Sequence, residues 1–183
     1  SQRALIVVPE SLMHQWLVEL RRRFALNFTL FDDERCEQAE ADSENPFLTE
    51  QHIIISSRFM HGSRWNEALL DAEFDLLIID EAHHLQPDAP EFSAVKSLCE
   101  AVPSLLLLTA TPEQEGAEGH FQRLQLLDPD RFSDFASFQQ EQAHYKELAE
   151  QAESVTDPAE LDDLLDKHGT GRVMFRNRRA DIG

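Results

Sequence analysis

The stretch DLLIIDEAHHL, residues 75–85, joins a strongly apolar run to a short polar cluster. The apolar part predicts a strand at 75–79 that is covered on both faces, because it is continuous rather than alternating. A carboxylate without a partner would be costly to bury inside such a strand. The polar cluster is therefore expected where the strand emerges from the sheet. Its members are Asp80, Glu81, His83 and His84.

The rest of the first 112 residues repeats the same alternation of apolar strands and helical patterns. Further strands are predicted at 4–8, 28–31, 52–56 and 104–108, and helices at 10–24, 63–72 and 91–101. Strands that alternate with helices in this way predict a parallel α/β sheet.

The helix predicted at 10–24 has one apolar face, and Ser11 is placed to cap its start. Trp16 belongs to that face, which predicts that it points toward the core. The residues of the face are Leu12, Met13, Trp16, Leu17, Leu20 and Phe24.

The pattern changes after Pro112. Helices are predicted at 117–127 and at 134–150, the second capped by Ser133. A further helix is expected to open at Thr156 or Asp157, before Pro158, and to close at Gly169 or Gly171. The sequence therefore predicts one domain over 1–116 and a helical extension with a linker over 117–183. The acidic stretch 32–46 is expected to be a mobile loop.

The charge of the chain limits its partners. The net charge is −19, from 16 basic and 35 acidic residues. Phosphate contacts need clustered Lys and Arg, so the sequence leaves room for only a small nucleic-acid footprint. Two cysteines, Cys36 and Cys99, are too few for a disulfide framework or a cysteine zinc site. No apolar run reaches the length of a membrane span.

Polar residues follow four of the predicted strands. They are found at 9–11, 56–58, 80–84 and 109–111. Ligands of open parallel sheets bind at the carboxyl ends of the strands. We therefore expect these four segments to form one functional rim.

Three of these segments carry a family resemblance. Asp80-Glu81-Ala82-His83 resembles motif II of the superfamily-two helicases, and Thr109-Ala110-Thr111 resembles their motif III. VVPESLMHQW, residues 7–16, is similar to motif Ia of the Swi/Snf-type translocases. The runs LLLLTATPEQ, LLDPDRF and RVMFRNRR resemble the bacterial branch that associates with RNA polymerase. The resemblance implies an incomplete RecA-like parallel sheet flanked by helices, with a helical C-terminal extension.

The resemblance also implies roles for individual residues. Asp80 would bind Mg²⁺ through its water shell, since this ion keeps several waters. Glu81 would position and deprotonate the attacking water, and His83 would link the nucleotide site to motif III. Thr109, Ala110 and Thr111 would form that coupling motif. The nucleic-acid strand would run over Ser11, Gln15, Trp16 and Ser56.

The function implied is that of a fragment of an ATP-dependent nucleic-acid translocase. Its cofactors would be ATP and Mg²⁺, and its partners double-stranded DNA and RNA polymerase during transcription recycling. It would work in the bacterial cytoplasm, at the nucleoid. The alternative is a non-catalytic RecA-like scaffold or polymerase-binding module.

One departure from the family pattern is large. The sequence has only six glycines and contains no G-x-x-x-x-G-K-[ST] phosphate loop. The family places this loop upstream of motif Ia and the arginine finger on a second lobe, so this chain alone is expected not to hydrolyse ATP. Loss of the loop strand would leave 104–108 as an open sheet edge. Such edges pair with other strands, here with residues 172–175 or with a second copy of the chain in a homodimer.

Other interpretations of the polar residues are simpler. Asp80 could cap the helix that follows, and Thr111 could merely end a strand. The cluster of Asp80, Glu81, His83 and His84 could bind a metal. It lacks the H-E-x-x-H spacing, however, and neighbours on a turn rarely all point at one ion.

Overall fold

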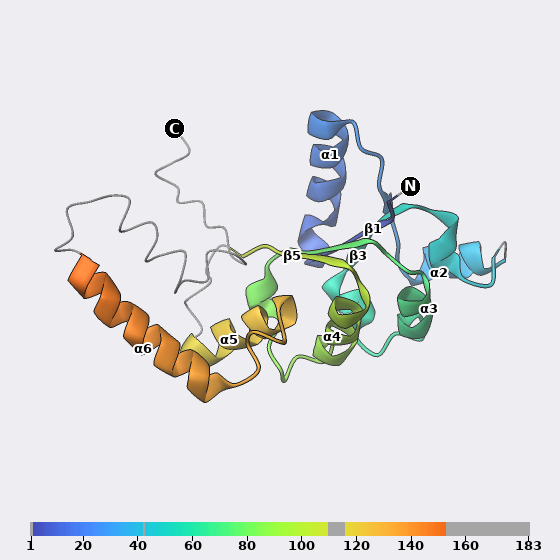
Figure 1. Cartoon of the computed structure of the whole chain (residues 1–183). Helices are drawn as coiled ribbons and strands as arrows, with labels where there is room; N and C mark the ends of the chain where they lie inside the picture. The colour runs from blue at the N-terminus through green and yellow to red at the C-terminus, as the bar shows by residue number, and fades with distance from the viewer. Residues whose placement is uncertain (1, 42, 110–115, 153–183) are drawn as a thin grey trace. The chain divides into compact units, whose positions relative to one another are not determined.

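The computed structural model describes residues 2–41, 43–109 and 116–152, whose elements are labelled in Figure 1. The chain divides into two compact units, residues 1–119 and residues 120–183. The helix predicted between 156 and 171 lies outside the described residues.

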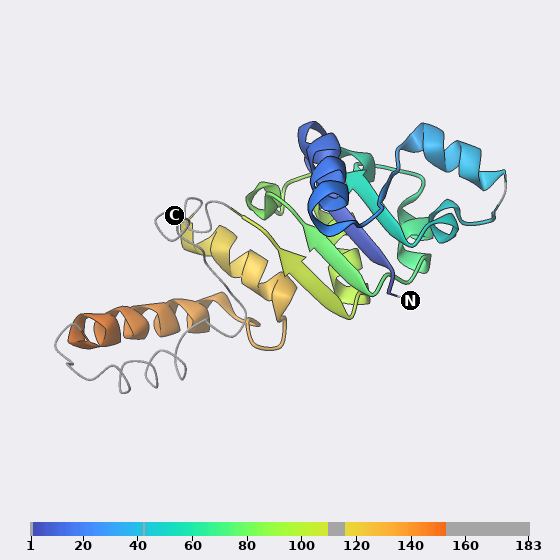
Figure 2. The ribbon, with the colours of Figure 1, turned by 90° about the horizontal axis from the view of Figure 1, so that it is seen from above.

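The first unit contains a parallel sheet of five strands among its described residues, in the order β2-β3-β1-β4-β5 (Figure 2). The strands are β1 (Ala4–Val8), β2 (Thr29–Leu30), β3 (His52–Ser56), β4 (Leu76–Ile79) and β5 (Ser104–Leu107). All four strand pairs are parallel. The prediction of a parallel α/β sheet is therefore confirmed, with β2, β4 and β5 shorter than expected.

Burial follows the position of each strand in the sheet. The central strand β1 is buried along its whole length, because β3 and β4 flank it and helices cover it. In register, Ile6 lies beside Ile54 on one side and Ile78 on the other. The next residue in this row is Leu106 of β5, which is 45% exposed. Among the described residues β5 has a neighbour on one side only, so 104–107 form a sheet edge as expected. Residues 172–175, predicted to cover it, lie outside the described residues, and the covering of this edge stays a prediction.

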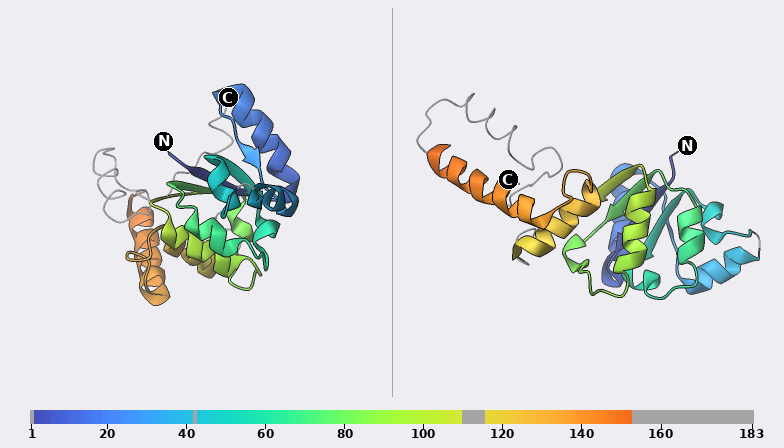
Figure 3. Two further views of the ribbon diagram at one scale, coloured as in Figure 1. Left: turned by 90° about the vertical axis from the view of Figure 1, so that its right-hand side faces the viewer. Right: turned by 60° about the horizontal axis from the view of Figure 1, so that its bottom comes forward.

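Helices cover the two faces of the sheet unequally. α1 (Met13–Phe24) lies on one face, and α3 (Asn66–Asp71) and α4 (Phe92–Ala101) lie side by side on the other (Figures 1 and 3). The apolar side of α1 packs against Ile6, Val8 and Ile54. The side chains that do so are Met13, Trp16, Leu17 and Leu20. Phe24, in the last turn, is 67% exposed, so its predicted place in the apolar contact is wrong.

The start of α1 also differs from the prediction. A 3₁₀ turn, η1 (Glu10–Leu12), precedes the helix, and the residue at the cap position is Leu12, with no side-chain hydrogen bond. Ser11 is therefore not the cap. Ser11 instead lies inside η1, which is closed by the Leu12 N–H donating to the Pro9 carbonyl at 2.9 Å.

The acidic stretch predicted to be a loop contains a helix, α2 (Asp33–Glu40). Asp32 caps it by accepting the Arg35 N–H at 2.8 Å. Two acids in the first turn suit the positive end of the helix dipole. Cys36 and Ala39, about one turn apart on this helix, are buried within the first unit. Only residues 41–45 lie between this helix and the next turn, η2 (Pro46–Thr49).

The second unit contains most of α5 (Gly116–Leu127) and all of α6 (Phe135–Ala152). Its apolar cluster consists of Phe121, Leu124, Phe132 and Phe138, with Leu127 and Phe135 packed against them. The cap of α6 is Asp134 and not Ser133. Asp134 Oδ2 accepts both the N–H and the hydroxyl of Ser137 at 2.8 Å, and the hydroxyl bond, followed by the N–H bond, lowers the pKa of this carboxyl.

No helix within the described ranges is both long and apolar enough to cross a membrane.

Candidate active site at the carboxyl end of the sheet

The polar cluster after β4 is held between the two neighbouring strands. The Asp80 N–H donates to the Val7 carbonyl at the end of β1, at 2.9 Å. The Ala82 N–H donates at 2.9 Å to the carbonyl of Leu108, just beyond β5. The cluster therefore leaves the sheet at a fixed point between β1 and β5, as expected for residues at the carboxyl end of a strand.

The backbone turns sharply at Glu81. This residue has φ 52° and ψ 41°, in the left-handed region, and it leads into the 3₁₀ turn η4 (Ala82–His84). A non-glycine residue in this region costs roughly 1–2 kcal/mol. Ala25 and Glu73 share the conformation just after helices, so positive φ alone does not mark the site. At Glu81 it brings the side chain back beside His83.

The carboxylate of Asp80 has a donor on each oxygen. Its Oδ2 accepts the indole Nε1–H of Trp16 at 2.8 Å, and its Oδ1 accepts the Glu81 N–H at 2.9 Å. The following turn η4 has no side-chain cap, so the simple role of helix cap is wrong for Asp80. A carboxylate has about four lone-pair positions, which leaves Asp80 able to accept further hydrogen bonds from water.

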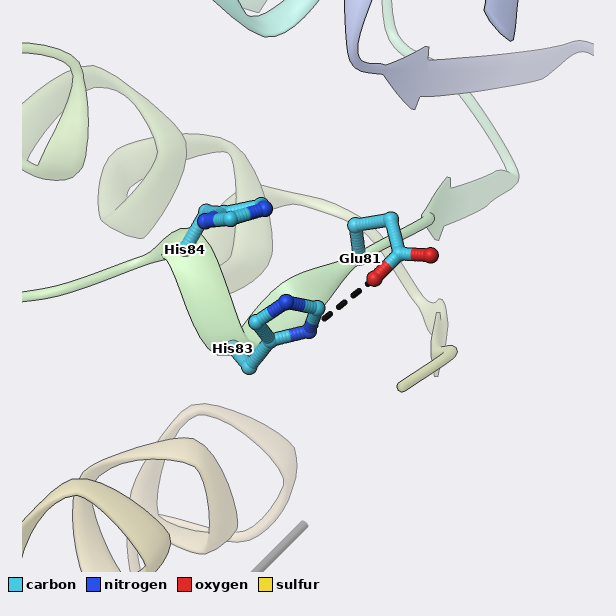
Figure 4. A group of neighbouring side chains, drawn as sticks. All are labelled: Glu81, His83 and His84. Carbon is cyan, nitrogen blue, oxygen red and sulfur yellow. Dashed lines mark ion pairs between the residues drawn. The ribbon is translucent and has the colours of Figure 1, made fainter. Parts of the chain in front are cut away.

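Glu81, His83 and Thr109 form a chain of polar contacts, and Figure 4 shows the contact between the first two. His83 Nδ1 lies 3.1 Å from Glu81 Oε2 and 3.2 Å from Thr109 Oγ1. An ionised carboxylate only accepts hydrogen bonds, so a hydrogen bond from His83 to an ionised Glu81 requires the proton on Nδ1. The side chains of His83 and Glu81 are 18% and 30% exposed, so Glu81 is both held in place and reachable by water.

His84 extends this cluster. Its ring lies 4.2 Å from that of His83, and one ligand atom from each of Glu81, His83 and His84 lies within 4.8 Å of the others. Three of the four residues considered for a metal site therefore lie close enough to share an ion, whereas Asp80 is not part of this group. Two imidazoles and a carboxylate form a ligand set typical of transition metals, whereas Mg²⁺ prefers the oxygens that Asp80 and Glu81 offer.

The residues predicted to line the nucleic-acid path have different environments. Ser11 and Gln15 are exposed, and Trp16 is partly buried with its N–H on Asp80. Ser56 is only 9% exposed, and its Oγ accepts the Phe59 N–H at the start of η3 (Ser57–Met60). Their contacts with nucleic acid stay a prediction.

The structure brings Asp80, Glu81, His83 and Thr109 together, whereas Ala110 and Thr111 lie outside the described residues. Sequence reasoning missed the bond from Trp16 to Asp80. The partners are 64 residues apart in the sequence, and no local pattern signals such a contact.

The chain is similar to a family of known proteins. Residues 1–182 match the family described as the SNF2-related domain. The RNA polymerase-associated protein RapA of Vibrio parahaemolyticus is 44% identical over 228 aligned residues, which cover all of this chain and 24% of the relative. The RapA protein of Erwinia tasmaniensis is 46% identical over 226 aligned residues, which cover all of this chain and 23% of the relative.

A solved structure shares the fold. It is the Sulfolobus solfataricus SWI2/SNF2 ATPase core domain, with a TM-score of 0.60 and 20% identity, over all of this chain and 35% of that one. The chain spans about a quarter of the length of the curated relatives it matches.

Proposed function

This chain belongs to the SNF2-related domain family, and we propose that it supplies the water-activating side of the site of an ATP-driven DNA translocase. The whole protein would work with RNA polymerase during transcription recycling. The support for this partner is the similarity to relatives named RNA polymerase-associated protein RapA.

One observation carries the proposal: two carboxylates, an imidazole and a hydroxyl meet at the carboxyl ends of β4 and β5. Asp80 and Glu81 follow β4, and Thr109 follows β5. His83 Nδ1 lies between Glu81 and Thr109, about equally far from both acceptors. Hydrolysis of a phosphate anhydride needs an oriented water, a proton acceptor and neutralised charge, and this group of side chains suits the first two requirements.

Glu81 is the proton acceptor in this proposal. As the oxygen of the attacking water bonds to the terminal phosphorus of ATP, the bond from phosphorus to the bridging oxygen breaks. The water proton passes to the Glu81 carboxylate. His83 keeps one oxygen of that carboxylate in place through its Nδ1–H, so the other oxygen is free to face the water.

The oxygens of Asp80 suit Mg²⁺, because hard carboxylate oxygens are what this ion binds. Asp80 would hold it through water, since each of its oxygens already accepts one protein hydrogen bond. When bound, Mg²⁺ neutralises charge on the phosphates. Because the sequence contains no phosphate-binding G-x-x-x-x-G-K-[ST] loop, the proposal assigns no residue of this chain to cradling the phosphates.

Thr109 is proposed to couple the catalytic site to DNA, because it shares His83 with Glu81. Ser11 and Gln15 are exposed where β1 turns into α1 and are proposed to contact DNA phosphates. With a net charge of −19, the chain alone should bind duplex DNA weakly and lose that binding steeply as salt rises. Fluorescence anisotropy at two salt concentrations measures this; tight, salt-insensitive binding would contradict it.

The decisive experiment is an ATPase assay of the protein encoded by the whole gene, with Glu81→Gln as the test variant. Removing a general base typically lowers the rate by about 100-fold or more. Glu73→Gln is the matched control. Glu73 also has a positive φ, but it follows α3 and is not part of the polar cluster after β4. An unchanged rate in Glu81→Gln, or an equal loss in both variants, would refute the role of Glu81.

The 183-residue chain is assayed alongside. It is expected to release no phosphate above background, because its sequence lacks the phosphate loop. If the whole protein is also inactive yet binds RNA polymerase, the non-catalytic module is supported in place of the translocase.

A further inference from the structure

The bond between Trp16 and Asp80 joins two parts of the site that are far apart in the sequence. Trp16 is on α1, whereas Asp80 follows β4. The Nε1–H donates to Asp80 Oδ2 at 2.8 Å, while the other carboxylate oxygen is held locally by the Glu81 N–H. The orientation of the Asp80 carboxylate about its side-chain axis therefore depends on one donor from another element.

The indole ring is well placed to fix that orientation. It packs with the apolar side of α1 against the cluster of Ile6, Val8 and Ile54. A planar ring held by such packing presents its single N–H in one direction. Hydrogen bonds to a charged acceptor are also about twice as strong as neutral ones.

The other tryptophan of the chain shows that this bond is not a general requirement of a partly buried indole. Trp65 is 5% exposed, and its Nε1 has no hydrogen-bond partner among the residues that the structure describes. The sequence contains two tryptophans, so one carries the bond and the other serves as a natural control.

We propose that Trp16 is a positioning residue: it sets the orientation of the Asp80 carboxylate and makes that orientation depend on the position of α1. The exposed Gln15 is next to Trp16 on the same helix. A ligand that shifts α1 would move the indole donor and change how Asp80 meets Mg²⁺. The inference rests on the proposed function only where it treats Asp80 as the acid that binds Mg²⁺.

The hydrogen bond is tested first in the 183-residue chain by ¹⁵N NMR of the indole N–H groups. Trp65→Phe assigns the two cross-peaks. In Asp80→Ala the Trp16 N–H is expected to move upfield and to exchange with solvent at least about tenfold faster, because its acceptor is lost. Asp71→Ala, at an exposed position on α3, should move neither peak.

The Trp65 cross-peak reports whether each variant is folded. If Asp80→Ala does not fold, Asp80→Asn keeps the shape of the side chain and weakens the acceptor, so an intermediate shift of the Trp16 peak is expected. A Trp16 peak whose position and exchange rate are the same in the wild type and in the folded variant would overturn the inference.

The consequence is tested in the protein encoded by the whole gene. Trp16→Phe keeps an aromatic ring but removes the donor, and the matched variant Trp65→Phe removes an N–H that has no partner among the described residues. Trp16→Phe is expected to raise the Mg²⁺ concentration for half-maximal ATPase about tenfold, as for one lost bond to a charged group. The rate at saturating Mg²⁺ should change less. Trp65→Phe should leave both values unchanged.

The two failures are distinguishable. If the wild type hydrolyses ATP but both tryptophan variants share its Mg²⁺ dependence, the positioning role is wrong and the proposed function stands. If the wild type does not hydrolyse ATP, the proposed function fails, and the NMR measurement still decides whether Trp16 holds Asp80.

Discussion

The two ends of the same sheet use polar side chains in opposite ways. At the amino end Arg3 ties distant segments together: its N–H donates to Asp75 at 2.7 Å, its Nε donates to the Ala72 carbonyl at 3.1 Å, and Nη2 donates to the Phe47 carbonyl. Its guanidinium also lies over the Phe74 ring. At the carboxyl end, by contrast, Asp80 accepts the Trp16 N–H, Glu81 lies beside His83, and the Glu81 side chain stays open to water.

The amino end also holds a cavity of about 380 Å³, lined by residues of α3 and α4 and of the segments that follow them. Its lining is mostly apolar: Leu69, Leu70, Glu73, Phe74, Asp75, Leu98, Ala101, Val102 and Pro103. The convergent polar groups are at the other end, where parallel sheets bind ligands. We therefore assign the structural role to the amino end and the chemistry to the carboxyl end.

The largest expected effect of a single substitution on stability at neutral pH is at the amino end. Arg3→Met should lower the free energy of unfolding by about 2–4 kcal/mol, because the Ala72 and Phe47 carbonyls lose their donors. Urea denaturation measures it. Arg23→Met is the matched control, since the ion pair of Arg23 with Glu19 is on the surface and such pairs contribute about 0–1 kcal/mol. Equal losses in the two variants would show that Arg3 has no special structural role at the amino end.

High pH tests the buried part of the molecule without touching the site. Burial, and for Cys36 also Asp33 and Asp32, raises the pKa of the Cys36 and Cys99 thiols from 9.0 to about 12. The folded chain therefore keeps protons that the unfolded chain releases above pH 9. Stability from this source is complete below pH 9 and is lost toward pH 12, by about 1.4 kcal/mol per pH unit for each thiol.

The measurement is urea denaturation across this pH range for the wild type and for the variant with both Cys36→Ala and Cys99→Ala. All other side chains are the same in both proteins, so the difference between the two slopes isolates the thiols. Parallel slopes would show that the thiols do not titrate differently on folding.

Glu73, near the amino end of the sheet, and Glu81, at the carboxyl end, both have a positive φ. Comparing the two separates backbone strain from function. Glu81→Gly and Glu73→Gly should each raise the free energy of unfolding by about 0.5–1 kcal/mol, because glycine adopts positive φ without steric cost. Only Glu81→Gly should abolish ATP hydrolysis by the whole protein. A stabilised Glu81→Gly variant that retained activity would contradict the assignment of Glu81 as proton acceptor.

The smallest effect is expected at Thr109. Thr109→Val removes the hydroxyl near His83 and should change stability by less than about 0.5 kcal/mol. The ratio of DNA-stimulated to basal ATPase rates should fall about threefold, as for one neutral hydrogen bond. Thr49→Val is the control, because its hydroxyl donates to the Pro46 carbonyl within η2. A ratio that falls equally in both variants would show that Thr109 has no coupling role.

The sequence alone determined the strands and the place of the polar cluster. Continuous apolar runs such as 4–8 and 52–56 predict strands buried on both faces, and both are formed over those residues. Asp80 and Glu81 could be assigned to a strand end because a charged group is costly to bury inside such a run, and Thr109 because it directly follows the apolar run 104–108. The cap signal at Asp32, followed by acids in the first turn, was also present, and it outweighs the polar composition that suggested a loop.

Tertiary structure decided which of these groups meet. The strand order sets β4 between β1 and β5, and only this order brings Trp16 to Asp80 and Thr109 to His83. The tertiary structure also buries Ser56, whose hydroxyl accepts the Phe59 N–H. The left-handed backbone of Glu81 arises where the chain must turn between two fixed hydrogen bonds, from Asp80 to β1 and from Ala82 to Leu108. Periodicity reports which face of an element is buried, whereas the partner of a side chain depends on crossover connections that join residues far apart in the sequence.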